Sequence, residues 1–396
     1  MRTSLKLLTV MVAAGTASVV YGDSFTAGVG QALKEGKADL NLRYRYEYVD
    51  QEPLAETAGA STLRSRLGWT SGQVAGIQGR IEVDNVTSIG AERYNDTLNG
   101  KGTYPVVADP TGTDLNQAWL SYTAAGAVGT LGRQRILHGD ERFVGGVAWR
   151  QNEQTYDAVR VVAPAGPVKF DYSYIWRVHT VFGNDSPQGE RDGKLHALRA
   201  DYALNDKHSL AGYVYELDFD DFAALSNRTL GLDYTGAVAM LKLHLALATQ
   251  QDTGDQPVDY SALYYLADVT ANAGPVALNL GYEVLGSDDG KRAFQTPLAT
   301  LHKFQGFADK FLATPANGIR DLYAGVGGAV AGVKLNATYH IYTADEGSAD
   351  YGDEINLSAA YAITPNVSVL AKYARYSADE LFTDTDKAWL MVTAGF

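Results

Sequence analysis

Cysteine is absent from the 396 residues of the sequence. The chain therefore has no disulfide framework, no thiolate metal site and no thiol nucleophile. Long apolar runs are missing as well, because no stretch beyond the N-terminal region approaches the roughly 18 consecutive apolar residues of a transmembrane helix. A chain of this length must be stabilised by some means other than disulfides.

Basic residues are in the minority, since 33 Lys and Arg stand against 46 Asp and Glu and leave a net charge of −13. This balance gives nucleic-acid binding no support. Recognisable catalytic motifs are missing too: no pair of histidines has metal-ligand spacing with a third ligand nearby, "KHS" (207–209) lacks a nucleophile motif, and no phosphate loop occurs. We therefore predict no enzymatic activity, no cofactor and no metal.

The N-terminus carries an export signal. Arg2 and Lys6 form a basic start, and the apolar run from Leu7 to Val20 ends in small residues. This pattern is typical of a secretory signal peptide. We predict a signal peptide over residues 1–22, with Ala17 as the alternative cleavage position, and one domain over residues 23–396.

Aromatic residues are abundant, above all 25 tyrosines, which is typical of a surface at the membrane–water boundary. Apolar and polar residues alternate in short segments from residue 36 to the C-terminus, as where Leu42, Tyr44 and Tyr46 enclose Arg43 and Arg45. Alternation with a repeat of two residues predicts strands with one apolar and one polar face. The pattern predicts 18 strands, starting near residues 38, 61, 76, 115, 128, 155, 168, 193, 208, 227, 238, 259, 275, 320, 332, 353, 366 and 386.

The connections between these strands alternate short and long. Short turns such as 124–129 and 272–276 face long loops such as 137–153 and 286–319, and the last strand ends on Phe396. An even strand number with this asymmetry predicts an all-β, closed antiparallel barrel in the outer membrane of a Gram-negative bacterium. The alternatives are a secreted β-sandwich or a β-solenoid, although no fixed repeat period supports a solenoid.

If the apolar alternates face lipid, the polar alternates face the lumen. The cations predicted to point inward are Arg43, Arg45, Arg64, Arg66, Arg80, Arg133, Arg135, Lys169, Arg177 and Arg199. The carboxylates predicted to point inward between them are Glu47, Glu82, Asp84, Asp171 and Asp201. Such charges can neutralise one another and stiffen the wall. They can also form an arginine-lined conduit for an anionic solute, because guanidinium stays charged and binds carboxylates bidentately.

Two blocks of sequence point to a family. "GRQRILHGDERFVGGVAWRQNEQTYDAVRVVAP" (132–164) and "FQTPLATLHKFQGFADKFLATPANGIRDLY" (294–323) resemble the alginate export family of outer-membrane barrels. The resemblance implies an 18-stranded barrel that lets a polyuronate cross the membrane through an arginine-rich constriction. Carried over to this sequence, the constriction residues are Arg133, Arg135, Asp140, Arg142, Arg150 and Asp157. The chain departs from the alginate exporters in being shorter, with reduced loops.

The 294–318 loop shows helix signals. Thr296 and Pro297 are typical of a helix start, apolar residues follow at helical spacing, and Pro315 ends the pattern. We predict a short amphipathic helix that either folds into the lumen as a lid or caps neighbouring loops. The candidate lid residues are Leu301, His302, Lys303, Phe304, Phe307 and Lys310.

Together these patterns predict a passive outer-membrane channel for an anionic solute, with an acidic polysaccharide such as alginate as the first candidate. An uptake porin for small carboxylates or oligosaccharides, and a closed structural barrel, are the alternatives. The expected partners are outer-membrane lipid and lipopolysaccharide beside the acidic outer loops, the barrel assembly machinery, and a periplasmic export scaffold if the chain is an exporter.

Overall fold

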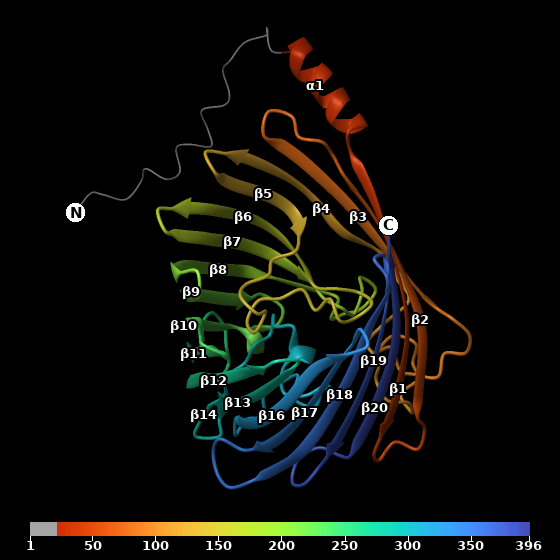
Figure 1. The fold of residues 1–396 in the computed structure, drawn as a ribbon, viewed down its shortest axis with the longest axis vertical. Helices are drawn as coiled ribbons and strands as arrows, with labels where there is room; N and C mark the ends of the chain where they lie inside the picture. Colours follow the sequence, from red (N-terminus) through yellow and green to blue (C-terminus); the bar gives the residue numbers. More distant parts are fainter. Residues whose placement is uncertain (1–21) are drawn as a thin grey trace, which may run out of the picture.

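The computed structural model describes residues 22–396, which form one closed sheet of 18 antiparallel strands (Figure 1). Residues 1–21 of the predicted signal peptide lie outside the described residues. The first nine strands are β1 (Lys37–Gln51), β2 (Ala58–Thr70), β3 (Ile77–Ser88), β4 (Gly112–Ala124), β5 (Ala127–Gln134), β6 (Thr155–Ala165), β7 (Val168–His179), β8 (Glu190–Asn205) and β9 (His208–Phe219).

The second half of the sheet follows in the same meander. Its strands are β10 (Asn227–Val238), β11 (Leu241–Gln251), β12 (Ser261–Ala273), β13 (Val276–Leu285), β16 (Ile319–Val330), β17 (Val333–Thr343), β18 (Asp350–Thr364), β19 (Val367–Ser377) and β20 (Thr385–Gly395). The shorter elements are helix α1 (Gly22–Lys34), the 3₁₀ turns η1 (Ala223–Leu225) and η2 (Leu301–Lys303), and a ribbon of β14 (Ser287–Asp288) and β15 (Arg292–Ala293).

Each strand of the barrel begins within three residues of its predicted start, so the predicted strand count is confirmed. The sheet closes between the first and last strands, where the amide of Leu40 donates to the carbonyl of Phe396 at 3.0 Å and the reverse bond measures 2.9 Å. Closure satisfies the backbone groups that an open edge would expose to lipid. A sandwich or solenoid is thereby excluded.

The outer face of the barrel is apolar. Leu67, Leu120 and Leu280 point away from the lumen and are 60%, 61% and 58% exposed. A water-soluble barrel would bury side chains of this kind, whereas a barrel in lipid exposes them. The disulfide-free chain is therefore stabilised by closure of the sheet and by its bilayer environment.

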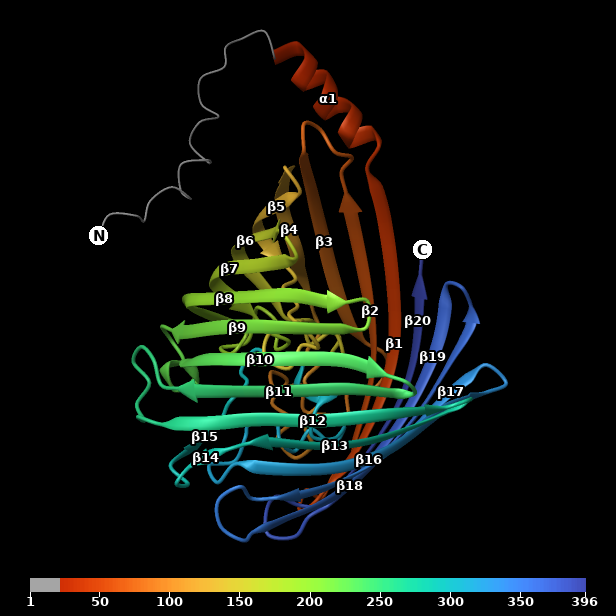
Figure 2. The ribbon, with the colours of Figure 1, turned by 60° about the vertical axis from the view of Figure 1, so that its left-hand side comes forward.

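The two rims of the barrel differ. One rim carries short turns such as Ala331–Gly332, whose positive φ angles of 50° and 83° are those of a type I′ hairpin turn. Helix α1 lies beyond this rim (Figure 2), where the amide of Gly72 donates to the carbonyl of Ala32 at 2.8 Å. No helix within residues 22–396 is long and apolar enough to cross a bilayer.

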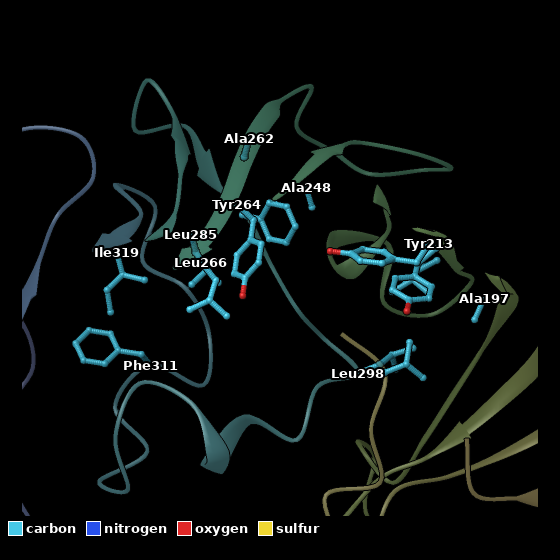
Figure 3. Close-up of a cluster of buried hydrophobic side chains, with 14 of the residues drawn as sticks. Ala197, Tyr213, Ala248, Ala262, Tyr264, Leu266, Leu285, Leu298, Phe311 and Ile319 are labelled. Carbon is cyan, nitrogen blue, oxygen red and sulfur yellow. The ribbon is translucent and has the colours of Figure 1, made fainter. Parts of the chain in front are cut away.

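The other rim carries the long loops, and two of them turn into the barrel. These inner loops, residues 135–154 and 286–318, lie inside the ring of strands (Figure 1) and pair with each other through a bridge between Val144 and Leu298. Buried side chains of the loops pack on inward residues of the wall, as Figure 3 shows for Leu298 beside Tyr213 and for Phe311 beside Ile319. The hydrophobic core of the protein therefore lies inside the lumen.

The helix predicted within residues 294–318 does not form, apart from the single turn η2. Gln305, Gly306 and Asp309 adopt positive φ angles of 47°, 82° and 60°, which a right-handed helix excludes. An irregular course of turns and bends lets the segment bury Leu298 and Phe311 against separate parts of the wall. Tertiary burial overrides the local helix signals here.

Candidate functional site

The inward faces of the first strands carry charges, as their alternation predicts. On β1 the polar side chains are buried while Tyr44 and Tyr46 between them are more exposed, and β2 and β3 alternate in the same way. The buried charged residues on these three strands are Arg43, Arg45, Glu47, Arg64, Arg66, Glu82 and Asp84.

One ionic network surrounds Glu82 and Glu153. Arg66 lies 2.5 Å from Asp84 and 2.9 Å from Glu153. Arg135 lies 2.5 Å from Glu82 and also pairs with Glu153. The side chains of Glu82 and Glu153 are only 2% and 1% exposed, whereas that of Arg135 is 29% exposed. The guanidinium group therefore covers its carboxylate partners on the lumen side.

The same arrangement recurs along this wall. Arg160 on β6 pairs with Asp171 at 2.5 Å, and the two side chains are 21% and 8% exposed. Arg80 on β3 keeps 15% of its side chain exposed beside the buried Glu82. Arg160 is a residue that the sequence analysis missed, although its alternation with the buried Tyr156 and Ala158 marks it as inward.

Two further predicted cations lie on β7 and β8. Arg199 lies 2.9 Å from Asp201 on its own strand and 3.8 Å from Asp233 on β10. Lys169 lies near the short-turn end of β7, directly opposite Asp201 in the register. The basic side of the lumen thus extends over β1 to β8.

Arg133 and Arg177 lie where the strands are irregular. The register pairs Asp157 with both arginines, and Asp157 lies between two inward residues that are fully buried. Strand alternation alone would turn Asp157 and its partners to the opposite face. Arg133 lies 2.9 Å from Asp157 at the end of β5, however, and lines a cavity together with the inward Asp84 and with Glu153 of the inner loop. His179 also contacts Asp157 at 2.9 Å. Because β5 ends at Gln134, Arg135 leaves the sheet and shares no face with Arg133.

A bulge explains Arg177 in the same way. The pairing of β6 with β7 shifts between Ile175 and Arg177, which reverses the alternation that the sequence pattern assumes. Arg177 pairs with Asp192 at 2.5 Å and Glu190 at 2.9 Å. The inward orientation predicted for Arg177 is therefore wrong.

Two inward arginines have no carboxylate partner. Arg43 and Arg64 face each other across β1 and β2. Arg43 donates to the side chain of Gln151 at 2.9 Å and to the carbonyl of Ala148 at 2.8 Å, and Arg64 donates to Asn41 at 2.5 Å. Within residues 22–396 neither forms an ion pair, so both leave positive charge beneath the 135–154 loop.

The arginines of that loop are buried and join the inner loops to the wall. Arg142 lies 2.6 Å from Glu283 of β13, and Arg150 lies 3.1 Å from Glu47 and 3.2 Å from Asp309. Burial alone would lower the pKa of Arg142, but the adjoining Glu283 raises it above its ordinary value, so the guanidinium stays charged.

Asp140 and Lys303 connect the two inner loops. The side chain of Asp140 accepts a hydrogen bond from the amide of Arg142 at 3.1 Å, and its carbonyl accepts one from Lys303 at 2.6 Å. Lys303 itself remains exposed. The ring of Phe304 lies 4.6 Å from the guanidinium carbon of Arg142, and Leu301 beside it is half-buried.

His302 forms the centre of a buried group, the His302 cluster, which also contains Trp149, Phe307, Asp309 and Lys372. Its ring stacks on Trp149 at 4.1 Å, its Nε2 accepts a hydrogen bond from Lys372 at 2.7 Å, and its Nδ1 donates to Asp309 at 2.7 Å. Burial, with Lys372 and Arg150 nearby, lowers the pKa of His302 to about 3 despite Asp309. The imidazole is neutral and does not face the solute as the sequence analysis expects.

Residues 294–318 of the second inner loop are called the inner segment from here on. The part of this segment that follows Lys303 is held by the wall of β17 to β20. The amide of Phe307 donates to Asn356 at 3.1 Å, the amide of Ala308 donates to Glu354 at 2.8 Å, and Lys310 donates to Thr385 at 2.9 Å. These bonds secure the segment on the side of the barrel opposite to β5 and β6.

Gly306 lies where this segment touches the wall most closely. A β-carbon at Gly306 would lie 2.4 Å from the Glu354 carboxylate and 2.4 Å from the Tyr342 hydroxyl. We therefore expect Gly306→Ala to displace the segment from the wall, at a cost of about 1–3 kcal/mol for overpacking. Trypsin should then cut the folded barrel at Lys303 and Lys310 several-fold faster than it cuts the wild type.

Gly347→Ala is the matched control. Gly347 also has a positive φ, of 85°, but nothing lies within 4 Å of an added β-carbon. The Gly347→Ala variant therefore shows the effect of backbone strain without a steric clash. Trypsin should cut this variant at Lys303 and Lys310 at the wild-type rate. Equal cleavage of both variants would contradict the proposed contact.

The other side of the lumen is acidic. A cavity of about 420 Å³ lies beneath residues 303–307 and is lined by Asp268 and Asp321 of the wall, together with Tyr323 and His340. Tyr323 donates to Asp268 at 2.8 Å, and His340 lies 2.9 Å from Asp321. Charge in the lumen is therefore distributed unevenly, with arginines over β1 to β8 and carboxylates over β10 to β16.

Some residues of the site escaped the sequence analysis. Glu283 and Lys387 sit at polar alternates of their strands, so period two would have identified them as inward. Glu153 and Asp309 lie on the inner loops, where no strand periodicity exists. Only the folding of the loops into the lumen brings them to the arginines.

Comparison with solved structures shows the same architecture. The chain superposes on the outer membrane protein OpdK of Pseudomonas aeruginosa with a TM-score of 0.72 at 15% identity, over 92% of this chain and 99% of that one. OccK3 (OpdO) of the same organism superposes with a TM-score of 0.70 at 13% identity, over 94% of this chain and 98% of that one. OccAB4 of Acinetobacter baumannii superposes with a TM-score of 0.71 at 13% identity, over 91% of this chain and 98% of that one. No curated protein sequence matches the chain.

The sequence profile of the alginate export family matches residues 36–266. These residues include β1 to β11 and the first part of β12, and with them the whole basic side of the lumen. Because the match covers more than half of the chain and lies within a complete barrel, the protein belongs to the alginate export family and is a porin-like channel of the Gram-negative outer membrane.

Proposed function

We propose that the channel passes carboxylate-bearing solutes, which move past the exposed arginines of β1 to β8. The observation that carries the proposal is the order of exposure within the ion pairs. Arg135 and Arg160 are 29% and 21% exposed, while their partners Glu82, Glu153 and Asp171 are 8% exposed or less. A solute in the lumen meets guanidinium groups before it meets carboxylates.

The chemistry of these groups suits carboxylates. Guanidinium is planar, stays charged and offers paired donors that match both oxygens of a carboxylate. Each arginine already has a carboxylate behind it, which reduces its net attraction for a second anion. A solute can therefore pass from one arginine to the next without tight binding.

The size of the solute follows from the inner loops. Their buried contacts with the wall narrow the lumen and favour a small carboxylate, and the similar barrel OpdK has been solved with vanillate. An acidic polysaccharide is the second candidate, because the family is described by alginate export. A periplasmic export scaffold and the barrel assembly machinery remain predictions as partners.

Planar-bilayer recordings test the proposal. We expect the wild type to prefer anions in reversal-potential measurements and to be blocked by vanillate or by uronate oligomers. In Arg135→Ala/Arg160→Ala the buried Glu82, Glu153 and Asp171 lose their cover, so anion preference should fall several-fold and reverse toward cations. Block by vanillate alone favours the small-carboxylate function, and block by the oligomers favours saccharides.

Arg177→Ala/Arg228→Ala is the matched control, since it removes two arginines that face away from the lumen, Arg177 after the bulge of β7 and Arg228 between two buried residues of β10. Its selectivity should equal that of the wild type. Cation preference in the wild type would overturn the proposal. The absence of any conductance would overturn it as well and leave a closed structural barrel as the interpretation.

A further inference from the structure

The inner segment carries a single carboxylate. Between Phe294 and Gly318 the only acidic residue is Asp309, among three basic or titratable neighbours at 302, 303 and 310. Asp309 has a positive φ of 60° and a side chain that is 5% exposed. Burial of a charged carboxylate is unfavourable by itself, so packing alone does not explain why this loop places Asp309 inside the lumen.

Asp309 is surrounded by donors from three different parts of the chain. One carboxylate oxygen lies 3.2 Å from Arg150 of the other inner loop and 3.1 Å from Lys387 of β20. The second oxygen accepts a hydrogen bond from His302 Nδ1 at 2.7 Å. Together these groups form a pocket for one carboxylate, with charged donors on one side and a neutral donor on the other.

Positive charge exceeds negative charge around this pocket, and the Asp309 carboxylate reduces the excess. Four cations lie in and beside it, namely Arg45, Arg150, Lys372 and Lys387, and the wall and the loops other than the inner segment supply two carboxylates, Glu47 and Asp109. Arg43 and Arg64 add positive charge nearby. Removing Asp309 would leave buried cations without a counter-charge, which is strongly unfavourable unless another anion enters.

Aromatic rings complete the pocket. The Lys372 ammonium lies 4.2 Å from the centre of Trp149 and 5.6 Å from that of Trp389. Apolar faces next to cations suit an anion whose carboxylate is attached to an apolar or ring-shaped group. The donors and the rings together resemble a binding site more than a simple ion pair.

We propose that Asp309 is an internal substitute for the solute, and that its carboxylate occupies a binding site for the carboxylate of a solute, formed by Arg150, Lys387 and His302. The inner segment and a free carboxylate then compete for one site. A solute that wins releases the segment from β19 and β20 and widens the lumen. The inference rests on the proposed function and assigns it a second, loop-gated site.

Chemical rescue tests this site. Asp309→Gly removes the carboxylate but keeps a residue that tolerates the positive φ. We expect its open-channel current to rise several-fold and to become noisy, because the segment has lost its anchor. Acetate at tens of millimolar should fill the space and restore the quiet wild-type current, since weak carboxylate binding is in this range. Acetamide, which has the same shape without the charge, should not restore it.

Two further variants separate site binding from damage. Asp289→Asn changes an exposed carboxylate of the same loop and should behave as the wild type with and without acetate. Lys387→Met combined with Asp309→Gly should lose the acetate rescue, because the pocket has lost a donor. Current that rises in Asp309→Gly without any acetate effect would overturn the proposal and make Asp309 a structural anchor only.

The outcome can be read independently of the proposed function. If the wild type prefers anions and the rescue fails, only the Asp309 site is refuted. If the wild type lacks anion preference, the exposed arginines of β1 to β8 do not select the solute, whatever the response to acetate.

Discussion

Replacing residues 297–313 with a short Gly-Ser linker is expected to raise single-channel conductance several-fold. The replaced residues include Leu298, Ala308 and Phe311, which are 5% exposed or less and occupy space inside the barrel. Their removal exchanges packed side chains for water along the conduction path. The strands should still close, because the ladder between β13 and β16 pairs every residue of β13 and does not involve the segment.

The measurement is conductance in planar bilayers, with heat-modifiable migration of the folded barrel as the check on folding. A matched control replaces residues 97–103 of the loop between β3 and β4 with the same linker, which alters the more exposed tip of a long loop and leaves the buried Tyr94 and Val107 in place. Its conductance should stay close to that of the wild type. An unchanged conductance in the 297–313 variant would show that ions take a path that the segment does not narrow.

Lowering the pH from about 7 to about 5 is expected to loosen the inner segment and increase the frequency of open-channel events. Inside the barrel His302 has a pKa of about 3, and a released His302 returns to its ordinary value of 6.5. Between these values the released state binds a proton that the packed state does not. The full free energy that favours the packed segment over the released one is therefore present above pH 6.5. It decreases as the pH falls, by about 2 kcal/mol at pH 5.

His302→Gln is the test of that cause. Glutamine keeps a polar side chain between Lys372 and Asp309 but cannot titrate, so its open-event frequency should be flat between pH 7 and pH 5. The groups that face His302 are Asp309, Lys372 and Arg150, and all three are retained in the variant. An equal pH response in the variant and the wild type would assign the effect to other titratable groups.

The strands were predictable because their information is local. Alternation such as that around Arg43 and Arg45 depends only on which neighbours are apolar, and a strand in lipid must turn apolar residues outward at every second position. Strand count, strand starts and the inward positions on β1 to β3 followed from this rule. The rule failed where the backbone departs from regular geometry, as at the bulge before Arg177 and at the end of β5 before Arg135.

The inner loops were not predictable in the same way. Thr296 and Pro297 carry helix signals, yet the segment is irregular apart from the turn η2, because burying Leu298 and Phe311 against separate parts of the wall outweighs local propensity. The pairing of Asp309 with Arg150 and Lys387 joins residues that are 159 and 78 positions apart. No periodicity links such positions, since the loops reach them only after the barrel has closed.

The sequence by itself determined that this protein is a disulfide-free, 18-stranded barrel with an apolar outer face and arginines inside, because period-two patterning needs no knowledge of distant residues. Only the tertiary structure decided which arginines face the lumen and which carboxylates lie behind them. It also decided that two loops enter the barrel and place Asp309 among cations. The physical reason is that charges in a lumen are partnered across strands and loops, and those distances exist only in the closed ring.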